Sequence, residues 1–274
     1  MIPAAFDYQR ADSADAALAL LNEHGDEAKL LAGGHSLLPL MKLRLAAPEV
    51  LIDVGRLDDL RYIREEGDVI AIGALTRHRD LETSALLQQQ APLLAHAASH
   101  VGDPQVRHRG TIGGSLAHAD PASDLPAVAL AMGATVVVRG QSGQREIPAD
   151  QFFLGFLESA MDPTELMVEI RFPKLGAHGW SFQKFNRRAQ DWAIVGVAAV
   201  HGAQHTGVAL VNMGSTPILS TAVSNAVKSG ASAVDAAALA ADGTEAQSDI
   251  NASVEYREHL ARVLVRRALV ESGV

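Results

Sequence analysis

The chain has 274 residues, of which 48% are hydrophobic and 20% charged, and its formal net charge is −9 at pH 7. This composition is typical of a globular protein of about two domains and excludes wholesale disorder. The negative charge argues against a general nucleic-acid-binding surface, because phosphate neutralisation needs clustered Lys and Arg. No apolar run approaches the roughly 18 residues needed to span a bilayer, and no signal-peptide pattern opens the chain, so we expect a cytoplasmic protein.

Cysteine is absent from the sequence. Its absence excludes a disulfide, a cysteine nucleophile and a cysteine-ligated iron–sulfur cluster within this chain. Any such cluster in an electron-transfer path would belong to another polypeptide. Aromatic residues make up only 4% of the chain, so few side chains are available to stack on a planar ring.

Helix and strand patterns alternate along residues 1–57, which we expect to form a small βαβ-like lobe. Ser and Asp residues supply capping chemistry where the first helix begins, and short apolar runs indicate buried strands. The expected elements are helices at 13–24 and 37–44 and strands at 29–32 and 50–54.

Residues 58–175 carry a mixed pattern, which predicts a second lobe of α+β type. The strand patterns in it are short and separated by helical stretches. The expected elements are strands at 61–64, 69–72, 135–139 and 166–172 and helices at 79–87, 92–101 and 124–132.

Pro173, Gly176 and Gly179 mark a boundary, so residues 176–274 are expected to form a third region. Apolar residues recur at helical spacing near the end of the chain. Arg residues in the last turns of this expected helix would interact favourably with the negative end of its dipole. The expected elements are strands at 181–185, 194–200 and 207–211, helices after Ser220, and a C-terminal helix.

Two double-glycine turns, at residues 32–36 and 111–115, are the most informative features of the chain. Glycine lacks a Cβ atom, so a glycine pair can turn sharply and direct successive N–H groups at an anion. The first turn joins a predicted strand to a predicted helix, where the helix dipole also favours an anion. After the second turn, Asp120 and Pro121 are typical of an N-cap and a first helical position. The two turns together predict a dinucleotide whose pyrophosphate lies between two loops.

Other nucleotide and metal motifs fit less well. Neither turn matches the Gly-x-Gly-x-x-Gly of a Rossmann site or the Gly-Lys-Ser/Thr ending of a P-loop. One glycine pair alone is typical of a structural turn, whereas two pairs in similar contexts favour a shared ligand. His96 and His100 lie four apart on a predicted helix, but no Glu follows His96 to complete a zinc motif, so we assign them a surface or capping role and predict no metal site.

Further segments extend this pattern over the whole chain, at 118–126, Lys184, 187–195 and 256–264. With the two glycine turns, they make the sequence resemble the FAD-binding medium subunits of molybdenum hydroxylases, in particular the carbon monoxide dehydrogenase type. The resemblance implies a two-lobed FAD-binding domain of the vanillyl-alcohol-oxidase/PCMH type. A C-terminal α+β domain with a small antiparallel sheet and helices would follow, and FAD would lie noncovalently between the two lobes.

The same resemblance implies roles for individual side chains. Asp120 and Asp124 would accept hydrogen bonds from ribityl or ribose hydroxyls, and helix capping is an equal reading for Asp120. Trp192 would cover the isoalloxazine ring, and Lys184 would neutralise phosphate or negative charge on the reduced flavin. We assign His35 a positioning role rather than a covalent link to flavin. The candidate FAD-binding residues are Ala32, Gly33, Gly34, His35, Ser36, Leu37, Thr111, Ile112, Gly113, Gly114, Ser115, Asp120, Asp124, Lys184 and Trp192.

The function implied by the resemblance is electron transfer within a heteromeric molybdenum hydroxylase. A small partner subunit would carry [2Fe-2S] clusters and a large one molybdopterin, in a dimer of heterotrimers, while FAD on this chain is the redox centre and no acid–base residue is expected. Ser115 stands where Asn is common in the family and keeps a hydroxyl that can donate. A stand-alone FAD oxidoreductase and a nucleotide-binding scaffold without redox activity are the alternatives. The acceptor, whether quinone, NAD or oxygen, stays open.

Overall fold

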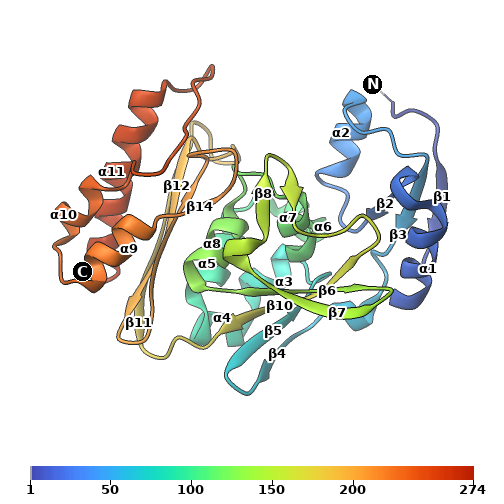
Figure 1. Cartoon of the computed structure of the whole chain (residues 1–274), viewed down its shortest axis with the longest axis horizontal. Helices are drawn as coiled ribbons and strands as arrows, with labels where there is room; N and C mark the ends of the chain where they lie inside the picture. The colour runs from blue at the N-terminus through green and yellow to red at the C-terminus, as the bar shows by residue number, and fades with distance from the viewer. Residues whose placement is uncertain (1) are drawn as a thin grey trace.

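The computed structural model of the protein describes residues 2–274 and has three parts that lie side by side (Figure 1). An N-terminal lobe and a C-terminal domain flank a central lobe. Each part combines helices with its own sheet, so the expected α+β class is confirmed. Within the described residues, no helix is both long and apolar enough to cross a membrane.

The N-terminal lobe is built on a three-stranded parallel sheet in the order β1-β3-β2. The predicted cap of its first helix is confirmed, because the Ser13 side chain accepts a hydrogen bond from the Ala16 amide at 3.0 Å. Strand β1 was not predicted. The elements are β1 (Asp7–Arg10), α1 (Ala14–His24), β2 (Ala28–Leu31), α2 (Leu37–Leu43) and β3 (Val50–Asp53).

The central lobe contains a five-stranded antiparallel sheet in the order β4-β5-β10-β6-β7. Its helices cover one face, and every residue of the apolar helix α8 is buried. The strands are β4 (Ile63–Glu66), β5 (Val69–Gly73), β6 (Thr135–Gly140), β7 (Gly143–Pro148) and β10 (Leu166–Pro173), with a separate hairpin of β8 (Phe153–Gly155) and β9 (Glu158–Ser159). The helices are α3 (His78–Thr83), α4 (Ala85–Gln90), α5 (Pro92–Ser99), α6 (Pro104–Arg109), α7 (Ile112–His118) and α8 (Asp124–Met132).

Two predictions in the central lobe were wrong in detail. The single helix expected at 79–87 is two helices, because Ser84 ends α3 and its hydroxyl then caps α4 by accepting from the Leu87 amide at 3.3 Å. Asp120 and Pro121 do not begin a helix, since α8 begins at Asp124 after Ser123. The Asp120 carboxylate instead accepts from the amide of Ala122 at 2.9 Å, a local turn that competes with helix capping.

The C-terminal domain has an antiparallel sheet in the order β11-β12-β13-β14, as expected. Alternate residues of β12 enter two different cores: Ala198 and Val200 pack with the central lobe, and Val197 and Ala199 pack with the C-terminal helices. The sheet is therefore buried on both faces and joins the domain firmly to the central lobe. The elements are β11 (His178–Phe185), β12 (Val195–Gly202), β13 (Thr206–Val211), β14 (Ile218–Leu219), α9 (Thr221–Lys228), α10 (Ala233–Ala238) and α11 (Val254–Glu271).

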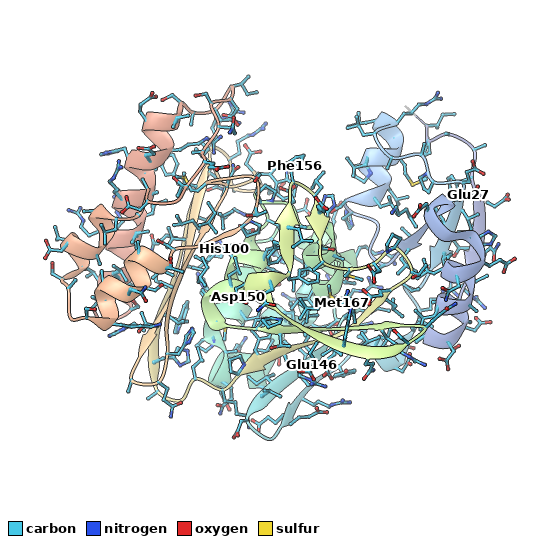
Figure 2. All side chains as sticks on the ribbon, viewed as in Figure 1. Glu27, His100, Glu146, Asp150, Phe156 and Met167 are labelled. Atoms are coloured by element: carbon cyan, nitrogen blue, oxygen red, sulfur yellow. The ribbon has the colours of Figure 1, made fainter. Side chains whose placement is uncertain are left out.

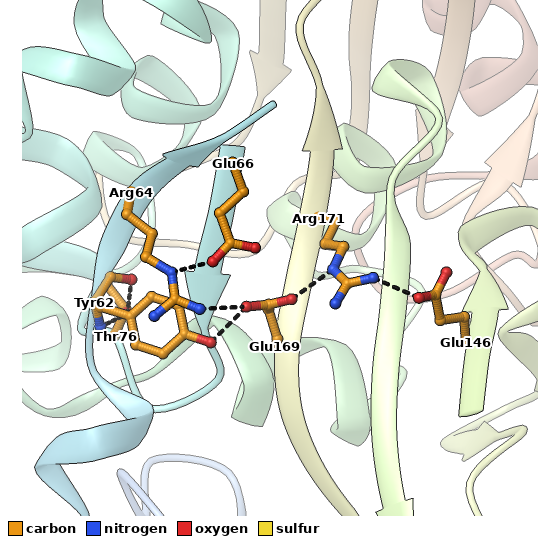
Figure 3. Close-up of polar contacts among 7 residues, drawn as sticks. All are labelled: Tyr62, Arg64, Glu66, Thr76, Glu146, Glu169 and Arg171. Carbon is orange, nitrogen blue, oxygen red and sulfur yellow. Dashed lines mark hydrogen bonds and ion pairs between the residues drawn. The ribbon is translucent and has the colours of Figure 1, made fainter. Parts of the chain in front are cut away.

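A polar network crosses the face of the central sheet that the helices leave open (Figure 3). Glu169 on β10 accepts hydrogen bonds from Tyr62 Oη at 2.6 Å and from Arg171 Nε at 2.5 Å. Arg171 also pairs with Glu146 on β7, and the Arg64 guanidinium lies 4.1 Å from the centre of the Tyr62 ring. Burial, with the hydrogen bond to Glu169, raises the pKa of Tyr62 far above its usual value, so its hydroxyl stays a donor. Arg64 on β4 also lies 3.5 Å from the buried Glu169 carboxylate, so the network links β4, β10 and β7.

Replacing Glu169 with Gln is expected to lower the free energy of unfolding by about 1–2 kcal/mol, because the amide cannot accept from all its charged donors. Urea denaturation of the full chain measures this change. The matched control is Glu65→Gln, which removes a half-exposed carboxylate paired with Lys174 and should change stability by less than about 0.5 kcal/mol. Equal stability of the Glu169 variant and the parent chain would contradict a structural role for the network.

Candidate functional site

A cavity of about 710 Å³ lies where the three parts of the chain meet. This volume is in the range of small-molecule and cofactor sites. Residues 28–37 line it from the N-terminal lobe, residues 113–115 from the central lobe, and Lys184 and residues 190–192 from the C-terminal domain. A ligand in this cavity would contact all three parts at once.

The first glycine turn lines this cavity and keeps its backbone amides free. Gly34 has a φ of +78°, a left-handed conformation that glycine adopts without strain. Within residues 2–274, no protein oxygen accepts a hydrogen bond from the amides of residues 33–36. Consecutive unpaired amides beside a cavity are suited to phosphate oxygens, as the sequence predicts for this turn.

The second glycine pair differs from its prediction, because its amides are already paired. Gly113 and Gly114 lie in the first turn of α7, not in a loop. The Gly113 amide donates to the Ala74 carbonyl at 2.9 Å, and the Gly114 amide donates to Thr111 Oγ1 at 3.1 Å. A Cβ at Gly113 would lie only 2.6 Å from that same Ala74 oxygen. The pair therefore allows close backbone packing, and the phosphate-nest argument holds for the first turn alone.

The first glycine turn packs directly against the backbone that leads into the second. A Cβ at Gly33 would overlap the Arg109 carbonyl oxygen and lie 2.9 Å from Gly110 Cα. Arg77, only 8% exposed, donates to that Arg109 carbonyl and to the Gly55 carbonyl at 3.1 Å. Gly55 follows β3 in the N-terminal lobe, so the guanidinium of Arg77 connects the two lobes beside the cavity.

A buried ion pair lies on the C-terminal side of the cavity. Lys184 Nζ is 2.7 Å from Asp124 Oδ2 and donates to the His100 carbonyl at 3.0 Å. The two charged side chains are 7% and 6% exposed. Burial raises the pKa of Asp124 to about 6, although Lys184 acts in the opposite direction. Lys184 is therefore already neutralised by Asp124 rather than a free cation.

One oxygen of this pair is left for a ligand. Asp124 Oδ1 is buried and has no hydrogen-bond partner among the described residues. Buried carboxylate oxygens normally accept hydrogen bonds. Because Asp124 lines the cavity, a hydroxyl-bearing ligand would supply the missing donor.

The structure brings nearly all candidate residues to this cavity. Each of them lines it except Ile112, which is fully buried in the central core. Trp192 is 60% exposed, which excludes a role as a core residue. Sequence reasoning missed Arg77 and His78, which hold the second turn from a neighbouring segment. An isolated Arg-His pair at the start of a helix gives no local sign of such contacts.

His96 and His100 lie outside the cavity, with their Nε2 atoms 3.2 Å apart. One ring donates to the other, and burial lowers the pKa of both. Across residues 2–274, no group of three or more His, Cys, Asp or Glu side chains is arranged to hold a metal ion.

Two known protein domains match the chain end to end. Residues 4–175 match the FAD-binding domain of molybdopterin dehydrogenases, and residues 180–272 match the C-terminal domain of carbon monoxide dehydrogenase flavoproteins. The chain belongs to the FAD-binding medium-chain family of molybdenum hydroxylases. The resemblance inferred from the sequence is therefore confirmed.

Individual relatives match this medium chain over nearly its full length. It is 43% identical to the carbon monoxide dehydrogenase medium chain of Hydrogenophaga pseudoflava, with 98% of this chain and 97% of that one covered. It is 40% identical to the 6-hydroxypseudooxynicotine dehydrogenase complex subunit alpha of Paenarthrobacter nicotinovorans, with 99% and 96% covered.

Solved structures give the same result. Carbon monoxide dehydrogenase from Hydrogenophaga pseudoflava matches with a TM-score of 0.95, and 99% of this chain and 98% of that chain are covered. Quinoline 2-oxidoreductase from Pseudomonas putida 86 matches with a TM-score of 0.92 at 30% identity, with 99% and 98% covered. This medium chain is accordingly an oxidoreductase subunit with a FAD-binding domain.

The residues of the cavity fit FAD. The free amides of residues 33–36 match the oxygens of a pyrophosphate, which needs donors. The unpartnered Asp124 Oδ1 matches a sugar or ribityl hydroxyl, which needs an acceptor.

Proposed function

We propose that this chain is the FAD-binding electron-transfer subunit of a heteromeric molybdenum hydroxylase. It would take electrons from [2Fe-2S] clusters on a small partner subunit and pass them to an external acceptor. A large partner would carry molybdopterin and the substrate site. The main support for this proposal is a cavity lined by all three parts of the chain. The chain also matches known medium chains over nearly its full length. The lack of cysteine supports clusters that are held by a partner.

In this proposal the side chains bind and orient a noncovalent FAD, which when bound supplies the redox chemistry. The amides of residues 33–36 hold the pyrophosphate, and His35 positions that turn without a covalent link. Asp120 and Asp124 accept hydrogen bonds from hydroxyls of the cofactor. Trp192 covers the isoalloxazine ring. The cofactor would lie between lobes spanning 1–57 and 58–175, with 176–274 as the C-terminal domain.

Exposed apolar side chains near the cavity support docking of a partner. Phe156, at the tip of the β8–β9 hairpin, is 67% exposed, and Leu154 is 61% exposed. Figure 2 shows Phe156 between the N-terminal lobe and the C-terminal domain, on the side where these two parts stand apart. Contiguous exposed apolar residues are typical of protein interfaces. We propose that the small subunit binds here, within a cytoplasmic dimer of heterotrimers.

The proposal is tested by expressing the chain alone and together with the small and large subunits proposed as its partners. We expect a yellow complex that contains iron and molybdenum and releases FAD into the supernatant on acid precipitation. A complex without iron and molybdenum, or steady turnover of a small electron donor by the chain alone, would favour a stand-alone oxidoreductase. Flavin retained in the precipitate would instead indicate a covalent bond, with His35 as the candidate anchor.

A further inference from the structure

His78 is a buried histidine in the wall of the cavity, and the family resemblance assigns it no role. It begins α3, is 3% exposed and lines the cavity. Its Nε2 lies 3.0 Å from Ser115 Oγ on α7, and its backbone amide donates to the Gly110 carbonyl at 3.0 Å. One residue therefore holds both the backbone that precedes the second turn and the hydroxyl that ends it.

The surroundings of His78 keep its ring neutral. Burial lowers its pKa to about 4 and outweighs a contact with the Thr111 backbone that acts in the opposite direction. The charges of His35, Arg107 and Arg77 lower it further. A neutral imidazole carries one N–H, on either Nδ1 or Nε2.

The contacts of the two ring nitrogens select the tautomer. Nδ1 has no hydrogen-bond partner among the described residues, and a Cβ built on Gly110 would lie 2.9 Å from it. The Thr111 backbone is near enough to affect the ring, but no hydrogen bond to it forms at Nδ1, so a proton there would be a buried donor without a well-placed acceptor, which folded proteins avoid more strictly than an unfilled lone pair. A proton on Nε2 has Ser115 Oγ as its acceptor. The geometry favours the Nε2–H tautomer.

We propose that His78 is a positioning residue for FAD: its Nε2–H donates to Ser115 Oγ and thereby leaves the serine hydroxyl proton free to donate to an oxygen of the FAD pyrophosphate. In the opposite arrangement Ser115 would donate to the ring and present only lone pairs to an anion. The proposal rests on the proposed placement of the pyrophosphate between the two turns. It gives the second turn a donor, although its glycine amides are already paired.

A double-mutant cycle on the full-length chain tests this inference. FAD affinity of the cofactor-free protein is measured by flavin fluorescence for Ser115→Ala, His78→Leu and the double variant. We expect Ser115→Ala to weaken FAD binding about tenfold, as for loss of one hydrogen bond to a charged group. His78→Leu removes the donor that orients the serine hydroxyl, so it should weaken binding in the same direction but by no more than Ser115→Ala. The double variant should be no weaker than Ser115→Ala alone, because His78 acts on FAD only through that hydroxyl. His78→Gln keeps an N–H donor and should restore most of the affinity, and His96→Leu, outside the cavity, should leave it unchanged.

The other outcomes show whether the role of His78 or the placement of the pyrophosphate is wrong. If Ser115→Ala weakens binding but His78→Leu does not, the inference is overturned and the placement of the pyrophosphate stands. If the two changes add, His78 acts only on the structure, and the inference is also overturned. If Ser115→Ala has no effect, the pyrophosphate does not contact this turn, and both the placement and the inference fail.

Discussion

Replacing Lys184 with Met should lower the free energy of unfolding by about 3 kcal/mol near neutral pH, because Asp124 then stays buried without its partner. The loss should shrink as the pH falls. In the parent chain burial already raises the pKa of Asp124 from 3.8 to about 6, and removing Lys184 raises it further. A raised carboxyl pKa means that the folded chain binds more protons than the unfolded one, so protonation relieves the penalty. Urea denaturation at about pH 7.5 and about pH 5.5 measures both effects.

Lys174→Met is the matched control for this prediction. Lys174 pairs with Glu65 at 28% and 47% side-chain exposure, so its loss should change stability by less than about 1 kcal/mol at either pH. Adding Asp124→Leu to Lys184→Met should recover most of the lost stability, since no unpaired charge then remains buried. A Lys184 variant as stable as the Lys174 variant would show that the pair is solvated rather than buried.

Gly33→Ala should weaken FAD binding about a hundredfold. This factor corresponds to roughly 3 kcal/mol, the free-energy cost of severe overpacking. The new methyl group would overlap the Arg109 carbonyl oxygen, which belongs to backbone and is also held by Arg77. The first turn would therefore have to move away from residues 109–110, and its free amides would move with it. Titration of the cofactor-free chain with FAD measures the affinity, and circular dichroism confirms that the variant is folded.

Gly230→Ala controls for the general effect of a methyl group on a glycine. Gly230 has a φ of +85°, and a Cβ there would meet no atom within 4 Å. Its left-handed backbone makes alanine cost about 1 kcal/mol of stability, but FAD affinity should not change. If Gly33→Ala binds FAD as tightly as the parent chain, then the cofactor does not depend on the packing of the first turn against residues 109–110.

Elements with local signals were predictable from the sequence. Helix α8 has its predicted bounds of Asp124–Met132 because its apolar run ends at Gly133, which adopts a φ of +66°. Strand β1 was missed because Asp-Tyr-Gln-Arg shows no apolar alternation. Its conformation comes from parallel pairing with β3, some forty residues further along by the printed numbering. Such distant pairing leaves no mark in the local pattern.

In the candidate site, too, local features were predictable and contacts between distant residues were not. Glycine pairs are local features, so both turns were found, whereas the pairing of the Gly113 amide with Ala74 depends on a strand end far away in the sequence. The resemblance indicated Lys184 and Asp124 separately, but not that they neutralise each other. His78 was missed for a related reason, because its importance comes entirely from what it contacts.

Arg77 also bears on how FAD would enter the chain. A guanidinium is rigid and planar, and here it spans carbonyl groups of Gly55 and Arg109 that belong to different lobes. It acts as a spacer of fixed length, so the distance between the two lobes at this point is set before any cofactor binds. A fixed distance between the lobes reduces the conformational entropy that the chain loses when it binds the cofactor. We therefore expect the empty and the FAD-loaded chain to share one lobe arrangement, with no hinge motion in between.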